Sequence, residues 1–214
     1  MAGWARERGG TVTSRERIFS KIEAATRSLA NRTELPDSQE AKAFRSRYVP
    51  KSDSVEVLEE RFEEAWTSVR GRLVRSESEL IVLLKEMGVE KGYVDPSIGT
   101  EKMGSEFELD SNFDRQIVDT YDFGISRATC GIAETGTIAL LDRDTPNRLG
   151  ALAPWVHVAV LERSRLRTRL YDAFEDFGKD PSVVLVTGPS KTADIEGIMI
   201  EGVHGPGEQI CWLV

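Results

Sequence analysis

Residues 71–94, GRLVRSESELIVLLKEMGVEKGYV, contain the clearest structural signal in the chain. An apolar pair near the start predicts a short strand, and Ser76 or Ser78 can accept a hydrogen bond at the start of a helix. Leucines at helical spacing follow, and Gly88 predicts the helix end. Apolar residues at 89–94 then resume an extended segment. The stretch therefore predicts a strand, a helix and a second strand, the βαβ unit of parallel sheets.

Further strands and helices alternate along the rest of the chain. Apolar runs rich in β-branched residues predict strands at 117–118, 137–141, 156–161, 183–186 and 210–214. Helices are expected between them, at 163–174 and 192–202. Strands that alternate with helices are typical of an α/β fold with a layered sheet.

The first 70 residues have a different character. Three of the 18 glycines lie within the first ten residues, and none lies between Thr11 and Arg70. Apolar residues recur at helical spacing and predict two helices, the first with Ile18, Ile22, Ala25 and Leu29, the second with Val55, Leu58, Phe62, Ala65, Trp66 and Val69. Pro36 and Pro50 mark an irregular connection between them. We therefore expect an N-terminal helical arm, residues 1–70, packed on an α/β domain, residues 71–214. The alternative is an independent module, although paired helices alone bury little surface.

The charge balance argues against nucleic acid as the main partner. The chain has 28 Lys and Arg against 36 Asp and Glu, which gives a net charge of −8. Its longest apolar runs fall far short of the roughly 20 residues that a membrane span needs. Its first residues form no apolar signal segment. We expect a soluble, cytoplasmic protein with no membrane span.

Metal and cofactor chemistry has few candidate ligands in this sequence. The two cysteines, Cys130 and Cys211, and the two histidines, His157 and His204, show no C-x-x-C or H-x-x-x-H spacing. An iron–sulfur cluster usually takes about four thiolates. A G-x-G-x-x-G dinucleotide fingerprint is also missing. We therefore expect no tightly bound metal and no flavin, haem or iron–sulfur cofactor.

The first candidate site is the segment 133–137, AETGT, directly before a predicted strand. Glu134 can act there as a carboxylate nucleophile or as a general base. Gly136 allows a positive φ or a close backbone approach, and Thr135 and Thr137 offer hydroxyls to a polar ligand. The alternative interpretation is a tight turn with a solvated Glu134.

The second candidate site is the segment 183–196, VVLVTGPSKTADIE, which predicts a strand, a Gly-Pro turn and a helix start. Backbone N–H groups and the positive end of a helix favour an anion. The candidate ligand-binding residues are Gly188, Ser190, Lys191, Thr192 and Asp194. The segment is not a Walker A loop, which needs a glycine directly before its lysine. The alternative is ordinary helix capping by Ser190 or Thr192.

The third candidate site is the loop 202–207, GVHGPG, before the last strand. His204 can donate or accept a proton near neutral pH, so it is a catalytic candidate. His157 lies inside an apolar run and is expected in the core. Cys211 also lies in an apolar strand, and nothing nearby marks Cys130 as a thiolate.

Together, the segments AETGT at 133–137, GPSKTADIE at 188–196 and GVHGP at 202–206 resemble the LUD domain family, over about residues 71–214. Lys191 is a departure, because the family more often has arginine there. The resemblance implies a three-layer α/β/α fold similar to the NagB/RpiA/CoA-transferase group. It also implies a role in a system that oxidises L-lactate to pyruvate, with iron–sulfur subunits as partners.

Two functions are compatible with these observations. In the first, the chain is an accessory or ligand-binding component of a lactate utilization system, without a redox centre of its own, that binds a small carboxylate or phosphate. In the second, it is a CoA-transferase-like or sugar-phosphate-isomerase-like enzyme that uses Glu134 as nucleophile or base.

One polar pocket is expected for either function. Open α/β sheets bind ligands at the carboxyl ends of their strands. We therefore expect six candidate residues to meet there: Glu134, Ser190, Lys191, Thr192, Asp194 and His204.

Overall fold

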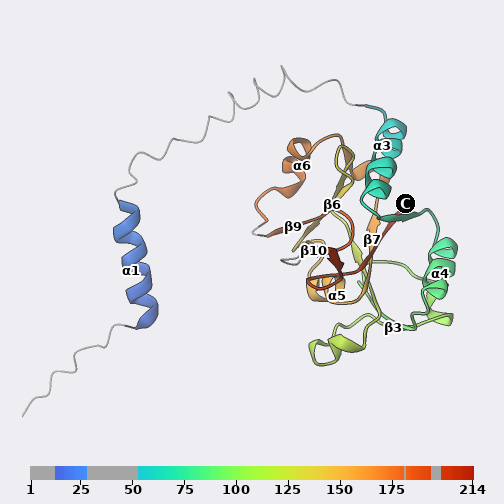
Figure 1. Ribbon diagram of the computed structural model, residues 1–214, viewed down its shortest axis with the longest axis horizontal. Coiled ribbons are helices and arrows are strands. Elements are labelled where there is room, and N and C mark those ends of the chain that lie inside the picture. The colour runs from blue at the N-terminus through green and yellow to red at the C-terminus, as the bar shows by residue number, and fades with distance from the viewer. Residues whose placement is uncertain (1–12, 28–52, 181, 194–198) are drawn as a thin grey trace, which may run out of the picture. The chain divides into compact units, whose positions relative to one another are not determined.

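The computed structural model describes residues 13–27, 53–180, 182–193 and 199–214 (Figure 1). The chain divides into two units, Met1–Pro50 and Lys51–Val214, and each is described by itself. In the first unit, helix α1 spans Ser14–Arg27. Thr13 and Glu16 cap its start reciprocally, since the Glu16 carboxylate accepts from the Thr13 N–H at 2.7 Å and the Thr13 hydroxyl accepts from the Glu16 N–H at 3.3 Å.

The second unit is built on a six-stranded sheet in which every neighbouring pair is parallel. Its strands are β1 Arg72–Val74, β2 Lys91–Val94, β3 Glu108–Asp110, β4 Phe123–Arg127, β7 Val156–Leu161 and β12 Glu208–Leu213. Their order across the sheet is β1-β12-β7-β4-β2-β3. All six residues of β7 are buried, as expected for a central strand covered on both faces.

A smaller mixed sheet and a hairpin complete the strands. The mixed sheet has the order β8-β5-β6-β9, with β8 Leu166–Arg167, β5 Cys130–Ile132, β6 Thr137–Leu141 and β9 Val183–Val186. The hairpin pairs β10 Lys191–Ala193 with β11 Met199–Glu201 in antiparallel fashion.

Helices cover both faces of the parallel sheet. They are α3 Val55–Ser68, α4 Glu77–Glu86, α5 Arg148–Leu152 and α6 Leu170–Phe177, with 3-10 turns η1 Met103–Ser105, η2 Arg115–Thr120 and η3 Arg163–Arg165. Leu80 and Leu84 of α4 join the core on one face. Phe62 and Trp66 of α3 pack on the other face together with the mixed sheet, and α6 covers the far side of that sheet. This layering confirms the predicted α/β fold (Figure 1).

Helix α4 forms where the sequence predicts it. The Ser76 hydroxyl accepts from the Glu79 N–H at 3.2 Å, and Gly88 follows the helix end with φ of +70°. The strands that flank it are not neighbours, however. β12, β7 and β4 lie between β1 and β2, so the chain crosses most of the sheet through α4.

Helix α3 belongs to the second unit. Its Phe62 and Trp66 rings stack at 5.9 Å and are fully buried, and the Trp66 indole N–H donates to the Arg72 carbonyl at 2.7 Å. The division of the chain therefore falls before α3, at Pro50–Lys51, and not after residue 70. The first predicted N-terminal helix corresponds to α1, which contains Ile18, Ile22 and Ala25. Its fourth apolar residue, Leu29, lies outside the described residues.

Three predicted elements differ in the structure. Ile117 and Val118 lie in η2, because Asp114 caps a 3-10 turn there, and the strand begins later, at Phe123. The predicted helix at 163–174 is interrupted at Leu166, which pairs with β5. The predicted helix at 192–202 is wrong at its described ends, which form β10 and β11. Short apolar runs fit a helix or a strand by period alone, so pairing with distant strands decides.

Candidate functional site

Glu134 lies in the tight turn between β5 and β6. Its side chain is exposed, and its backbone N–H donates to the Thr168 carbonyl at 3.0 Å. Residues of the turn and of α3 enclose a small cavity of about 320 Å³, lined by Arg61, Glu64, Ala65, Ser68, Ala133 and Glu134. Glu134 is therefore a solvated carboxylate at the surface, which corresponds to the tight-turn alternative.

Gly136 has a packing role in the same turn. Its φ is +58°, and an added Cβ would lie 2.4 Å from the Trp66 backbone nitrogen. Only glycine fits between the turn and α3 without displacing backbone. Close packing of the turn on α3 therefore accounts for a glycine at this position, and no bound ligand is needed to explain it.

A chain of three threonine hydroxyls links this turn to the end of β9. The hydroxyls of Thr135 and Thr137 are 2.7 Å apart, and those of Thr137 and Thr187 are 2.8 Å apart. The structure therefore brings the first and second candidate segments together. Each hydroxyl of Thr135 and Thr137 already has a protein partner, so the chain ties the hairpin to β9.

Lys191 was predicted at the amino end of a helix, but it lies beside the carboxyl end of α3. Its ammonium group donates to the Val69 carbonyl at 3.5 Å, and Val69 caps the carboxyl end of α3. A cation there complements the negative end of the helix dipole. Gly188 lies beside it with φ of +75°, where a Cβ would come within 2.3 Å of the same carbonyl. The predicted helix start after the Gly-Pro turn is wrong, because β10 begins at Lys191.

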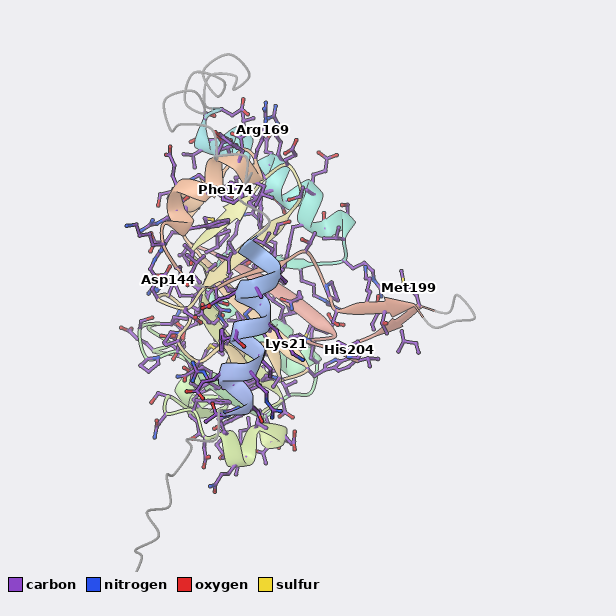
Figure 2. All side chains as sticks on the ribbon, turned by 90° about the vertical axis from the view of Figure 1, so that its left-hand side faces the viewer. Lys21, Asp144, Arg169, Phe174, Met199 and His204 are labelled. Carbon is purple, nitrogen blue, oxygen red and sulfur yellow. The ribbon has the colours of Figure 1, made fainter. Side chains whose placement is uncertain are left out.

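Ser190 meets the third candidate segment. Its N–H donates to the Pro206 carbonyl, and its carbonyl accepts from the Gly202 N–H, both at 2.9 Å. His204 is exposed in this loop, near the base of the β10–β11 hairpin, which carries Met199 (Figure 2). Thr192 is half-buried and pairs with Ile200, whereas Asp194 lies outside the described residues.

The candidate residues do not meet in one pocket at the carboxyl ends of the strands. The loop with His204 precedes β12 and so lies at the amino end of the parallel sheet. Glu134 lies against α3, and the threonine hydrogen bonds link its turn to Thr187 at the end of β9. Most candidate residues thus surround the carboxyl end of α3, a packing region.

His157 is fully buried in β7, as expected. Its Nδ1 lies 2.8 Å from Oε1 of Gln209, and its Nε2 lies 2.9 Å from the Ser126 hydroxyl. Because Oε1 can only accept, Nδ1 carries the proton and Ser126 donates to Nε2. Burial lowers the pKa of His157 to about 4, so the ring is neutral at pH 7.

Both cysteines are buried in the core. Burial raises the pKa of Cys130 to about 12 and also raises the pKa of Cys211. Neither is an accessible thiolate for a cluster or a nucleophile. Within the described residues, no three His, Cys, Asp or Glu side chains gather in a way that could hold a metal ion.

Polar residues at the carboxyl ends of β2 and β4 escaped the sequence interpretation. Asp95 directly follows β2, and Arg127 is the last residue of β4. Ser97 lies between them: its hydroxyl donates to Asp95 at 2.6 Å and accepts from Nε of Arg127 at 3.4 Å. A polar residue directly after each apolar strand could have indicated this site in the sequence. It was not recognised because β4 was not predicted as a strand.

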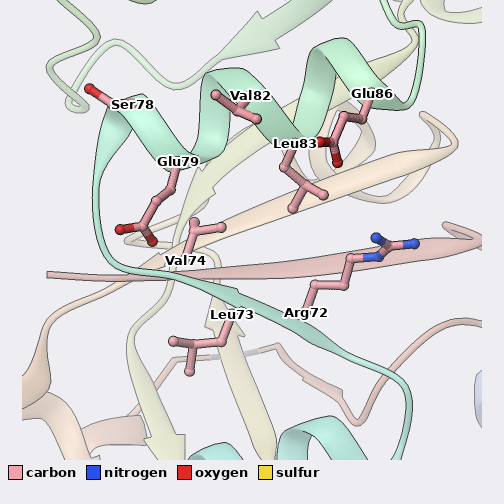
Figure 3. Close-up of a pocket in the computed structure, with 8 residues that line it drawn as sticks. All are labelled: Arg72, Leu73, Val74, Ser78, Glu79, Val82, Leu83 and Glu86. Atoms are coloured by element: carbon pink, nitrogen blue, oxygen red, sulfur yellow. The ribbon is translucent and has the colours of Figure 1, made fainter.

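A mainly apolar groove lies between α4 and the edge strand β1. It has a volume of about 620 Å³ and is lined by Arg72, Leu73, Val74, Ser78, Glu79, Val82, Leu83 and Glu86. Val74 points from the strand toward the helix, and Leu83 points back (Figure 3). None of the candidate site residues predicted from the sequence lines this groove. Among the described helices, none combines the length and apolar character needed to cross a bilayer.

The protein is of the α/β class: helices cover a parallel sheet, and a second, mixed sheet packs on one of its faces. The LUD domain matches residues 22–214, and the chain therefore belongs to the LUD domain family. A crystal structure of a DUF162 family protein from Deinococcus radiodurans has the same fold, with a TM-score of 0.57 and 20% identity. The similarity covers 76% of this chain and 99% of that one.

Curated relatives match part of the chain. "Uncharacterized protein NMB1437" of Neisseria meningitidis serogroup B is 34% identical over 115 residues, which are 51% of this chain and 49% of the relative. "Lactate utilization protein C" of Oceanobacillus iheyensis is 31% identical over 135 residues, 56% of this chain and 55% of the relative. The matched segment thus spans about half the length of these relatives.

Proposed function

We propose that this protein acts in lactate utilization as an accessory component that binds a small anionic ligand and works beside iron–sulfur subunits. Membership of the LUD domain family supports this role. Relatives at about 30–33% identity carry the name lactate utilization protein C. Oxidation of L-lactate to pyruvate releases two electrons, which a partner subunit with a redox centre accepts.

The placement of the two cysteines is the observation that supports the accessory role. Both thiols are buried in apolar clusters, and their raised pKa values keep them protonated at neutral pH. Iron–sulfur clusters need several accessible thiolates, about four in most cases. These buried thiols support a division in which the partner subunits carry the electrons of lactate oxidation and this chain binds the ligand.

The exposure of Glu134 favours the accessory role over a CoA-transferase-like enzyme. A carboxylate nucleophile or base gains reactivity when its surroundings desolvate it or hold it against the substrate. Glu134 instead lies in solvent at a hairpin turn, and its neighbour Glu64 on the same cavity is also acidic. Arg61, the one arginine among the described residues that line this cavity, already pairs with Asp53 at 2.6 Å. The two glutamates therefore disfavour anionic thioester and sugar-phosphate substrates.

Reconstitution tests this proposal. The purified chain is combined with the iron–sulfur proteins of the same system, and L-lactate-dependent dye reduction is measured with and without the chain. We expect the rate to fall at least tenfold when the chain is omitted, and Glu134→Gln to leave the rate unchanged. An unchanged rate on omission contradicts the accessory role. A loss of a hundredfold or more in Glu134→Gln favours the enzyme alternative.

A further inference from the structure

The parallel sheet changes winding direction between β2 and β4. After β2 the chain continues to β3, on the side away from β4. After β4 it passes through the mixed sheet to β7, on the side away from β2. In open α/β sheets, ligands bind outside the carboxyl ends of the two strands at such a switch point. The topology therefore singles out the residues that follow β2 and end β4.

Asp95 is held firmly at this point. It is 4% exposed, and its N–H donates to the Ile125 carbonyl at 2.9 Å, which continues the pairing of β2 with β4. Ser97 donates to Oδ1 of Asp95 from its N–H at 2.9 Å and from its hydroxyl at 2.6 Å. Among the described residues, only this oxygen of the carboxylate has hydrogen-bond donors. Oδ2 is left for a ligand hydroxyl.

Arg127 faces the same serine. Its guanidinium donates to the Ser97 carbonyl at 2.9 Å and lies 3.2 Å from the Glu162 carboxylate. Glu162 is 47% exposed, and an ion pair this open contributes little because water competes for both partners. An incoming carboxylate can therefore replace Glu162 on Arg127. Arginine suits that exchange, since it binds carboxylates through two parallel hydrogen bonds.

The neighbouring arginines at this edge are engaged differently. Arg75 follows β1 and Arg163 follows β7, and both contact Glu59 of α3. The Glu59 side chain is only 12% exposed, and Arg75 also pairs with a second glutamate, Glu63, at 2.7 Å. Displacing Glu59 would disturb a largely buried carboxylate that two arginines share. Of these three arginines at the carboxyl edge, Arg127 is the one that does not pair with the largely buried Glu59.

We propose that the carboxyl ends of β2 and β4 form a binding site for a small 2-hydroxycarboxylate. The ligand carboxylate takes the place of Glu162 on the Arg127 guanidinium, and the ligand hydroxyl donates to Oδ2 of Asp95. Ser97 keeps the two groups at a fixed separation. This inference rests on the proposed function and names the site at which that function would bind its anion.

Calorimetric titration of the full chain with L-lactate tests the site, at fixed ionic strength. Arg127→Gln is expected to weaken binding at least tenfold, and Glu162→Gln to strengthen it several-fold because the competing carboxylate is removed. The matched control is Arg72→Gln, whose partner Glu208 also lies at 3.2 Å, but at the amino end of the sheet. Its affinity for L-lactate should equal that of the unaltered chain.

Two comparison probes test the ligand class. Acetate lacks the hydroxyl and should bind at least fivefold more weakly than L-lactate, and inorganic phosphate should also bind more weakly. Equal binding of either probe overturns the hydroxycarboxylate assignment. Unchanged L-lactate affinity in Arg127→Gln, or an equal loss in Arg72→Gln, overturns the site.

Circular dichroism and dye reduction distinguish a failure of folding, a failure of the site and a failure of the proposed function. If circular dichroism shows that Arg127→Gln is unfolded, Glu162→Gln decides alone, and unchanged or weaker affinity in it overturns the proposal. Binding that maps to Arg127 while omission of the chain leaves dye reduction unchanged contradicts the proposed function only. Dye reduction that needs the chain, with L-lactate affinity independent of Arg127, contradicts the site only.

Discussion

At the scale of single residues, His157 places a titratable ring in the centre of the parallel sheet. Ser126 and Gln209, on the two adjacent strands, occupy both ring nitrogens, and these bonds compensate the burial of the polar group. A protonated ring would place a positive charge in the centre of the sheet, away from water. Burial without a counter-charge therefore keeps the imidazole neutral.

This environment predicts a pH-dependent stability. The pKa of His157 is about 4 in the folded protein against 6.5 for an ordinary histidine. Between these values the unfolded chain binds a proton that the folded chain does not, so stability falls as the pH drops from 6.5 to 4, by roughly 3 kcal/mol. Urea unfolding at several pH values measures this. His157→Gln should lose this component of the slope, and His204→Gln, at the exposed histidine, should retain it.

At the scale of elements, positive-φ glycines decide where α3 sits. Gly136 and Gly188 both let a turn approach the backbone of α3, at Trp66 and Val69 respectively. The sequence interpretation associated these glycines with ligand binding, because a glycine-rich turn after a strand fits both explanations. Contact with the helix is a property of the folded chain alone.

The packing role predicts different costs for two alanine substitutions. Gly88→Ala places a Cβ at φ of +70° with no atom within 4 Å, so it should cost about 1 kcal/mol from backbone strain. Gly136→Ala adds a collision with the α3 backbone at 2.4 Å and should cost about 2–4 kcal/mol. Chemical denaturation compares them, and equal losses would contradict the packing role of Gly136.

At the scale of the whole molecule, α3 determines where the folded domain begins. Leu58, Phe62 and Trp66 fill the core between the two sheets, and Glu59 pairs with arginines from two strand ends. The second unit thus includes the helix that the sequence interpretation assigned to an arm. A chain that starts at residue 71 would leave these apolar surfaces in water.

Two truncations test this boundary. Deletion of residues 1–50 should leave a monodisperse protein with a cooperative thermal transition, because the core residues of the second unit all follow Lys51. Deletion of residues 1–70 should give aggregation, since the α3 side of the core is lost. Light scattering and thermal melts distinguish the two. Two equally well-behaved truncations would restore the boundary at residue 70.

Local patterns alone determined much of this protein. Helix α4, with a capping serine and a closing glycine, and the strands β6, β7 and β12 lie within a few residues of their predicted positions. Each has an apolar run long enough to show its period or a capping residue that acts within one turn. The motif residues at 133–137, 188–196 and 202–206 also led to the LUD domain family from the sequence.

Only the tertiary structure decided the order of the strands and the surroundings of the candidate residues. Gly124 is the second residue of β4, and an added Cβ there would meet the Gly150 carbonyl of α5 at 1.8 Å. The assignment of β4 therefore depends on a helix packed across it. Lys191 lies in a strand because residues 199–201 pair with it, and it contacts the end of α3. Such contacts join residues far apart in the chain, and a local pattern carries no record of which distant backbone will lie beside it.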